Sequence, residues 1–214
     1  MVDVSLLREL LAENEGTVLD FKAAPYHFDD ERSTSKFIKD ILAMANTPRD
    51  EPAYIIVGVA YNPDGSRDLL GVEPGSHLDD ADLQNKLNLA KVEPKPAFVY
   101  QPMTLDGLSY GVIEIPVQAH GPYIATKDYG IVKAHHVYFR RGSQNDYAVN
   151  SEERRDIYRW FNRSREAEVP VMDESTPTAM PNWDEFMLAC HRFDASRLYV
   201  LIVGPDLNNN KDNW

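Results

Sequence analysis

Hydrophobic side chains recur at helical spacing in two stretches near the N-terminus. Leucines three and four residues apart predict an amphipathic helix at 3–13, and a second apolar stripe predicts a helix at 33–46 with a serine or threonine cap. Between them, residues 17–22 alternate between two faces, as a β-strand requires. The continuous apolar run at 54–59 is typical of a central strand that is buried on both faces.

Further along the chain, the same patterns predict more helices and a hairpin. The expected elements are a helix at 79–91, a hairpin of strands at 98–103 and 109–117, a strand at 137–141 and a helix at 151–165. Asp106-Gly107 lies between the two hairpin strands and is a preferred pair for a tight turn. The predicted fold class is α+β, with a mixed and mainly antiparallel sheet flanked by helices, in a domain at 1–165.

The C-terminal part has a different composition. Three prolines among acidic and small polar residues predict a linker at 166–181. Within 182–214, a capping-box pattern opens a further helix and the apolar run at 197–204 predicts a buried strand. We therefore expect the start of a second α/β region, in a chain that is the N-terminal part of a longer protein.

Composition narrows the class of protein. Of the 214 residues, 43% are hydrophobic and 26% are charged, as in ordinary globular proteins. The single cysteine excludes an internal disulfide and a cysteine-rich zinc site. The sequence has neither an apolar stretch of about 18 residues nor a secretory signal pattern, so we expect a cytoplasmic protein without a membrane partner.

Charge is unevenly distributed along the chain. The formal net charge is −12, but residues 121–165 hold nine basic and five acidic residues and carry +4, which leaves −16 on the remainder. A uniformly acidic surface would repel nucleic acid, whereas a basic segment can attract it. Composition alone therefore does not show whether nucleic acid is a binding partner.

The sharpest candidate site lies in the predicted strand at 17–22. Asp20 and Lys22 are two residues apart, so their side chains leave the same face of the strand, and Glu15 in the preceding turn can bend toward them. Two carboxylates beside an ammonium suit Mg²⁺ or Mn²⁺ at a phosphodiester, with Glu15 and Asp20 as ligands and Lys22 at the phosphate. These three residues are the candidate catalytic residues. An ion pair on a surface strand explains the same spacing and is very common.

Candidate nucleic-acid contacts are basic residues, two of them beside aromatic side chains. Arg140 and Arg141 end a predicted strand just before a glycine turn, which suits binding of backbone phosphates. Lys36 and Lys133 complete this set of candidates. A solvated strand end explains the two arginines equally well. The sequence contains neither a P-loop nor a glycine-rich dinucleotide motif.

Four motifs occur in a specific order. They are Glu15-x4-Asp20-Phe-Lys22, the helix end Ala43-Met-Ala-Asn-Thr47, the strand Tyr54-Ile-Ile-Val-Gly-Val59 and the segment Val137-Tyr-Phe-Arg-Arg-Gly-Ser143. In this order they resemble the Schlafen-type AlbA domain over about residues 6–161. The resemblance implies an α+β fold and nucleic-acid binding. In the Schlafen branch it implies a metal-dependent endoribonuclease acting on structured RNA such as tRNA, with Glu15, Asp20 and Lys22 at the matched positions.

The sequence departs from the family pattern at three places. Asp20 stands where glutamate is usual, and a Pro-Arg-Asp-Glu-Pro segment at 48–52 replaces a glycine pair. Ala60 and Tyr61 follow the Gly-Val strand end, where the nuclease branch carries its third acid. Asp64 is the nearest candidate for a third metal ligand. A site with one carboxylate fewer should bind metal more weakly.

The sequence supports two classes of function. The leading hypothesis is a nucleic-acid-engaging, Schlafen-like module of a larger prokaryotic defence or regulatory protein, with Mg²⁺- or Mn²⁺-dependent cleavage of RNA or DNA as its enzymatic form. The alternative is a catalytically inactive oligomerisation or interaction module, or an ATP-linked regulatory module. In family members with two copies of the domain, the copies would pair within one chain. A member with a single copy would instead pair with a second chain, so we expect a homo-oligomer.

Overall fold

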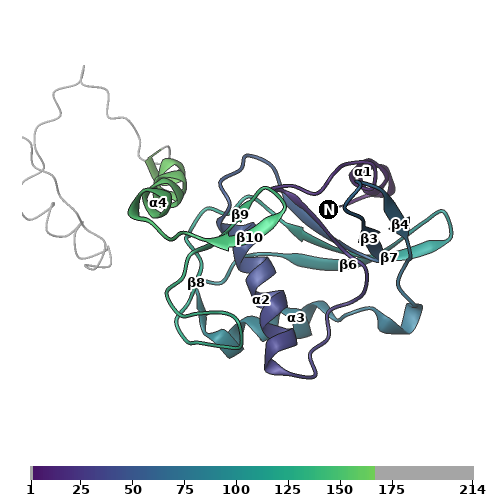
Figure 1. The fold of residues 1–214 in the computed structure, drawn as a ribbon, viewed down its shortest axis with the longest axis horizontal. Coiled ribbons are helices and arrows are strands. Elements are labelled where there is room, and N and C mark those ends of the chain that lie inside the picture. Colours follow the sequence, from purple (N-terminus) through teal and green to yellow (C-terminus); the bar gives the residue numbers. More distant parts are fainter. Residues whose placement is uncertain (1, 167–214) are drawn as a thin grey trace, which may run out of the picture. The chain divides into compact units, whose positions relative to one another are not determined.

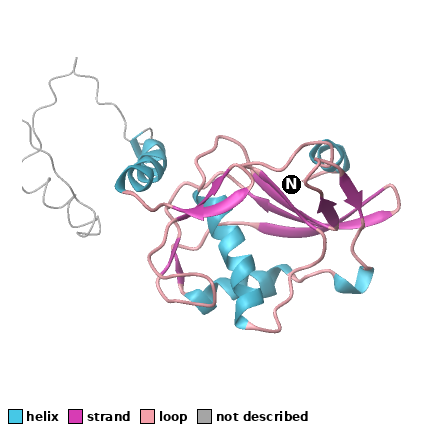
Figure 2. Ribbon diagram, in the orientation of Figure 1, coloured by secondary structure: helices cyan, strands magenta, loops and turns pink. Residues whose placement is uncertain are grey.

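The computed structural model describes residues 2–166, which form a β-sheet with helices packed on both faces (Figures 1 and 2). The central sheet has the strand order β1-β2-β7-β6, in which β1 is Leu19–Lys22, β2 is Ala53–Val57, β7 is Leu108–Ile115 and β6 is Val99–Leu105. β1 runs parallel to β2, and the other two neighbouring pairs are antiparallel. The predicted fold class, α+β with a mixed and mainly antiparallel sheet, is confirmed.

Helices and short antiparallel ladders accompany this sheet in the described part of the chain. The helices are α1 Val4–Leu10, α2 Glu31–Asn46, α3 Asp80–Lys86 and α4 Ser151–Glu166, with 3-10 turns η1 Pro74–Ser76 and η2 Leu87–Ala90 on either side of α3. The ladders are β3 Val59–Tyr61 with β4 Arg67–Leu69, β5 Val92–Glu93 with β8 Ile124–Ala125, and β9 Tyr138–Arg141 with β10 Gln144–Tyr147. The β9–β10 hairpin packs against α2.

Two hydrophobic cores lie on opposite faces of the sheet. Because side chains alternate along a strand, Ile55 of β2 lies in the core beneath α2, whereas Tyr54 and Ile56 lie in the core beneath α1. The apolar stripe expected on α2 is buried in the larger core, at Phe37, Ile38, Ile41, Leu42 and Ala45. Full burial of one large apolar side chain stabilises a fold by roughly 1.5–3 kcal/mol, so this stripe fixes α2 on the sheet.

The apolar run expected as one strand at 54–59 divides at Gly58. β2 ends before this residue, and Gly58 has a φ of +101°, which side chains other than glycine adopt only with strain. A Cβ at this position would lie 2.9 Å from the backbone carbon of Gly71. The expectation of a single strand is therefore wrong, because the chain turns here and continues as β3 in a separate ladder with β4.

Two predicted helices have different limits in the structure. α2 begins two residues earlier than expected, because Asp30 caps it by accepting a hydrogen bond from the backbone N–H of Ser33 at 2.6 Å. The expected serine or threonine cap is thus replaced by an aspartate. The helix expected at 79–91 keeps α-helical geometry only to Lys86, continues as η2, and ends at Lys91, whose φ is +48°.

The predicted hairpin of β6 and β7 is confirmed. Asp106 and Gly107 both have positive φ values, +51° and +83°, as a two-residue type I′ turn requires. β6 is an edge strand, and its outer side is protected. Pro102 has no N–H to offer, and the Asp80 carboxylate accepts the N–H of Tyr100 at 2.7 Å. Addition of a further strand at this edge is thereby disfavoured.

The predicted linker at 166–181 and the predicted α/β region at 182–214 lie outside the described residues, apart from Glu166, which ends α4. Within residues 2–166, none of the helices has the length and apolar character that a membrane crossing needs.

Candidate functional site

The candidate residues of β1 belong to a buried cluster of charges. Asp20 and Lys22 project from the same face of the strand, as predicted, and Lys22 Nζ lies 2.6 Å from Asp20 Oδ2. The same ammonium lies 3.1 Å from Oδ2 of Asp40 on α2. The Asp20 side chain is 6% exposed and that of Lys22 is 30% exposed. The contact is therefore not the ordinary surface ion pair that the spacing alone allowed, because its carboxylate is removed from water.

Arg140 completes the cluster from β9. Its Nη1 lies 3.0 Å from Asp20 Oδ1, and its Nε and Nη2 donate to the carbonyl oxygen of Gly16 at 3.1 and 2.8 Å. Asn145 of β10 links Arg140 to Asp40, because its Oδ1 accepts from Arg140 Nη1 at 3.1 Å and its Nδ2 donates to Asp40 Oδ1. These contacts close into a formally neutral ring, called the ionic ring below: Asp20, Lys22, Asp40, Asn145 and Arg140.

The structure places both predicted arginines in contacts with other protein groups, and their role as phosphate contacts stays a prediction. Arg140 has 2% of its side chain exposed, and its guanidinium is directed at groups inside the protein rather than at solvent. Arg141 is exposed but lies 3.0 Å from Asp146 and 2.6 Å from Glu153 in two ion pairs. These two carboxylates engage Nε and Nη2 of Arg141 and offset its positive charge. Neither residue is therefore presented as a ready contact for a nucleic-acid backbone.

Two residues at the cluster, Asp40 and Tyr26, were not predicted from the sequence. The signal for Asp40 was an acid three residues after Phe37, at the border of the apolar stripe of α2, where a buried charge needs a partner. The Tyr26 hydroxyl, from the loop after β1, donates to Asp40 Oδ2 at 2.7 Å. This hydroxyl and the Lys22 ammonium share one carboxylate oxygen, so the loop is tied to the ionic ring.

Burial and neighbouring charges shift the pKa values in this cluster. Burial raises the pKa of Asp40, an effect that Lys22 opposes. Burial also raises the pKa of Tyr26 well above its usual value, and the Asp40 carboxylate adds to this shift. Burial by itself would lower the pKa of Lys22, but the carboxylates of Asp40 and Asp20 raise it above its usual value. Lys22 is therefore a cation at neutral pH.

The helix-end motif Ala43-Met-Ala-Asn-Thr47 holds β9 in place. The side-chain N–H groups of Asn46 donate to the carbonyl oxygens of Tyr123 at 2.8 Å and Tyr138 at 3.0 Å, and its Oδ1 accepts from the N–H of Tyr123 at 2.7 Å. Thr47 Oγ1 accepts from the backbone N–H of Arg140 at 2.8 Å. These buried polar groups fix the strand that carries the arginine of the ionic ring.

The segment that departs from the family pattern, Pro-Arg-Asp-Glu-Pro, contains a second buried arginine. Arg49 Nη1 donates to the carbonyl oxygens of Met44 and Thr47 at 2.6 and 3.2 Å, and Nη2 donates to those of Ile115 and Pro116 at 3.0 and 2.8 Å. Burial lowers the pKa of Arg49 to about 10. A cation at this place interacts favourably with the helix dipole of α2 and joins the helix end to β7.

The three predicted metal ligands do not converge. Glu15 Oε1 accepts the backbone N–H of Phe21 at 2.9 Å, and Asp64 lies in the exposed turn between β3 and β4, where it accepts from Ser66 N at 2.9 Å and Ser66 Oγ at 2.6 Å. Asp20 is neutralised within the ionic ring. Among residues 2–166, no group of three or more acidic, histidine or cysteine side chains is arranged to hold a metal ion. The geometry does not fit Mg²⁺ or Mn²⁺, and that assignment stays a prediction.

Of the remaining basic candidates, Lys36 lies beside the ionic ring. Its exposed side chain and that of Lys22 line the same cavity of about 210 Å³, which Tyr26 and Asp40 also line. Lys133 is exposed elsewhere on the domain surface and forms an ion pair with Asp128 at 3.2 Å. The structure therefore brings two of the predicted basic residues, Lys22 and Lys36, to one cavity.

Comparison with protein families identifies the domain. The family model described as Schlafen, AlbA_2 matches residues 15–149, which is more than half of the chain. The chain belongs to the Schlafen AlbA_2 family. The resemblance read from the four ordered motifs is confirmed. The matched segment of this Schlafen AlbA_2 protein runs from before β1 to beyond β10 and so contains every residue of the ionic ring.

The Schlafen AlbA_2 chain is similar to two solved structures. One is the DIP2311 protein of Corynebacterium diphtheriae, at 19% identity and a TM-score of 0.47, over 75% of this chain and 28% of that protein. The other is the N-terminal domain of a Nitrosomonas europaea protein named as related to the ATP-dependent DNA helicase RecG, at 21% identity and a TM-score of 0.40, over 71% of this chain and 96% of that domain. No curated protein matches the sequence significantly.

Proposed function

We propose that this Schlafen AlbA_2 domain binds nucleic acid through backbone phosphates, with Lys22 and Lys36 as the principal phosphate contacts. The observation that carries the proposal is the position of the Lys22 ammonium. It is held between Asp20 and Asp40 and still lines the cavity that Lys36 shares. The proposal agrees with the nucleic-acid binding that the family resemblance implies.

The chemistry of an ammonium supports this role. Lys22 has three N–H donors, and its ammonium lies within ion-pair distance of the carboxylates of Asp20 and Asp40. Because Lys22 also lines the cavity, its ammonium can donate to a phosphate oxygen that enters there. The ionic ring is formally neutral, so it adds no net charge that would repel a phosphate from Lys22. Lys36 is exposed and lines the same cavity, so its positive charge adds to the attraction for a phosphate.

Metal-dependent cleavage of the bound nucleic acid would be a more specific function of the same domain. It would require Glu15, Asp20 and Asp64 to hold Mg²⁺ or Mn²⁺ together, and the geometry above does not group them. We therefore derive no step that passes through a metal ion. The proposed activity is binding, as a module of a larger regulatory or defence protein. Self-association, as expected for an oligomerisation module, is a separate hypothesis. Analytical ultracentrifugation of the full chain, which measures its oligomeric state, tests it.

Fluorescence anisotropy with the full chain tests the proposal. A labelled single strand of RNA, one of DNA and the matching duplexes are titrated with the parent protein, with Lys36→Ala and with Lys95→Ala, in EDTA. Lys95 is also exposed but lines neither cavity described for this domain. We expect Lys36→Ala to weaken binding at least severalfold and Lys95→Ala to leave it unchanged. Equal binding by all three proteins, or none by the parent, would overturn the proposal.

The same samples test cleavage. After incubation with Mn²⁺, Mg²⁺ or EDTA, the labelled strands are separated on a denaturing gel. We expect intact strands under all three conditions. Metal-dependent products that Asp20→Asn abolishes would replace the binding proposal by the nuclease function that the family resemblance implies.

A further inference from the structure

A second and larger cavity adjoins the one that holds the two lysines. It has a volume of about 470 Å³ and shares three wall residues with the smaller cavity, namely Pro25, Tyr26 and His27. Its other walls come from Phe28, Asp29 and the segment 75–78 around η1. A volume of this size is in the range of small-molecule sites in proteins.

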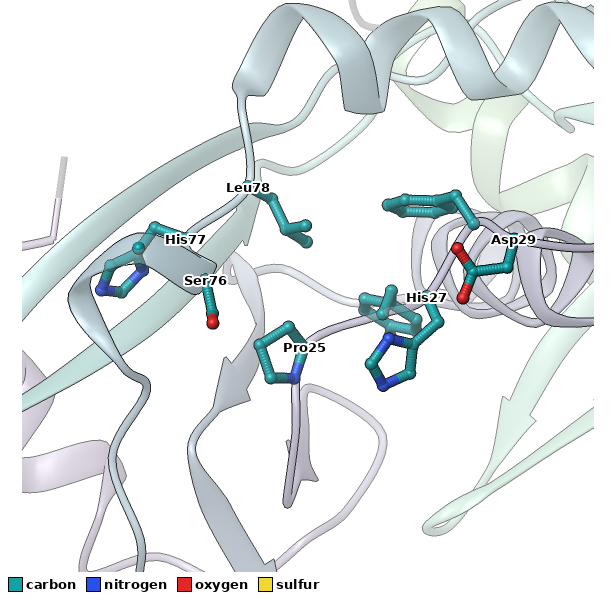
Figure 3. A pocket seen from close by; sticks show the side chains of 9 residues that line it. Pro25, His27, Asp29, Ser76, His77 and Leu78 are labelled. Atoms are coloured by element: carbon teal, nitrogen blue, oxygen red, sulfur yellow. The ribbon is translucent and has the colours of Figure 1, made fainter.

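The two cavities differ in their chemistry. The lysines Lys22 and Lys36 line only the smaller one. The larger one is lined by ring side chains and Leu78 together with polar groups such as Ser76, and its acid, Asp29, does not line the smaller one. Figure 3 shows Pro25 and His27 on one side of the larger cavity and Ser76 and Leu78 on the other. The smaller cavity is thus suited to an anion and the larger one to a flat ring with polar edges.

The walls of the larger cavity are fixed by the protein core. The rings of Tyr26 and Phe28 both pack edge to face on the buried Phe37, with centroid distances of 5.1 and 5.7 Å. On the opposite wall, His77 Nδ1 lies 2.8 Å from the Tyr100 hydroxyl, and the imidazole points away from the cavity in Figure 3. Neither wall needs to be ordered when a ligand arrives, which lowers the cost of binding.

We propose that the two cavities together accept one unpaired nucleotide, with its phosphate at Lys22 and Lys36 and its base in the larger cavity. This inference rests on the proposed function and adds that the domain selects single strands. A base held in a duplex cannot leave its stack to enter the cavity without losing its pairing. In the larger cavity a base would have His27 on one side and Leu78 on the other, and the Asp29 carboxylate there would disfavour a phosphate.

The deciding variant fills the larger cavity and leaves the lysines untouched. Ser76 is exposed and lines only the larger cavity, so Ser76→Trp blocks the place of the base. Ser5→Trp, at an exposed serine of α1 that lines neither cavity, is the matched control. Binding of the full-length variants to a labelled single-stranded RNA decamer and to its duplex is measured by anisotropy.

We expect the parent to bind the single strand more tightly than the duplex. We expect Ser76→Trp to weaken single-strand binding about tenfold or more, because stacking of one base is worth roughly 1–3 kcal/mol. Duplex binding, and both affinities of Ser5→Trp, should stay at the parent's values. If Ser76→Trp binds the single strand as tightly as the parent while Lys36→Ala does not, the base cavity is refuted and phosphate binding stands. If the parent binds neither nucleic acid, the proposed function itself has failed.

Competition with adenosine monophosphate distinguishes the two sources of a nucleotide. If the free nucleotide displaces the decamer from the parent but not from Ser76→Trp, the site accepts free nucleotides as well as strands. Binding of the decamer that is sensitive to Ser76→Trp but not to the free nucleotide assigns the site to a strand alone.

Discussion

Arg140 and Asp20 are 120 positions apart in the sequence and form an ion pair with 3.0 Å between Nη1 and Oδ1. Both side chains are less than one-tenth exposed. Removing two charges from water costs several kcal/mol per ion, and only good geometry with further hydrogen bonds offsets that cost. Gly16 and Asn145 accept those hydrogen bonds from Arg140. The ionic ring therefore couples the edge strand β1 to the distant β9.

Arg140→Met should destabilise the domain by about 3–5 kcal/mol, because it leaves Asp20 buried with one of its two cationic partners removed. Urea unfolding followed by circular dichroism measures this free energy. The control is Arg141→Met at the neighbouring, exposed position, whose unfolding midpoint should stay close to that of the parent. Similar midpoints for the two variants would show that the ionic ring does not hold the fold together.

Thr47→Val should cost about 1–3 kcal/mol of stability. The variant keeps the shape of the side chain but loses the hydroxyl that accepts the N–H of Arg140 and donates to the carbonyl oxygen of Ala43 at 2.7 Å. Thr47→Ser retains the hydroxyl and should recover most of that loss. Equal stabilities of the valine and serine variants in the same unfolding experiment would contradict the role given to this hydroxyl.

The sequence predicted the elements whose evidence is local. α2 followed from its apolar stripe, and the β6–β7 hairpin followed from Asp106-Gly107. The strand predicted at 54–59 was too long, and the reason for its early end is a residue within that segment. Gly58 has a positive φ and ends β2. These features depend on residues within a few positions of one another, which is the range over which hydrophobic period and turn chemistry act.

The site could be predicted only in part, because most of its contacts join residues far apart in the chain. Spacing placed Asp20 and Lys22 on one face of a strand, and that was confirmed. No local rule pairs Asp20 with Arg140, so the arginine was interpreted as a phosphate contact. The same limit applies to Glu15, which was expected beside Asp20 but caps the N–H of Phe21 on the edge of β1.

Tyr26 should remain protonated at pH values where an ordinary tyrosine ionises. Its raised pKa means that the unfolded state loses the proton first, so stability should fall as the pH rises above about 10. The lowered pKa of Arg49 acts with the opposite sign in that range, so the comparison is with Tyr26→Phe. The stability difference between parent and variant should shrink above pH 10. A difference that is constant from pH 8 to pH 11 would refute the shift.

Divalent metal ions should leave the stability of the domain unchanged. Asp20 and Asp40 are already neutralised by Lys22 and Arg140, and the predicted ligands Glu15 and Asp64 lie in separate hydrogen-bonded turns. A ligand that binds only the folded state raises the thermal midpoint. Thermal unfolding in millimolar Mn²⁺ and in EDTA should therefore give the same midpoint. A higher midpoint in Mn²⁺ that Asp20→Asn removes would show that a metal site forms after all.

The central claim is that phosphate contacts at Lys22 and Lys36 hold nucleic acid, and the salt dependence of binding tests it most directly. The affinity for a single-stranded oligonucleotide is measured by anisotropy over a range of salt concentrations for the parent, Lys36→Ala and Lys95→Ala. Each phosphate contact contributes about 0.7 to the slope of log K against log salt for a single strand. We predict that Lys36→Ala lowers the magnitude of the slope by about this amount while Lys95→Ala does not. An unchanged slope in Lys36→Ala would contradict the account.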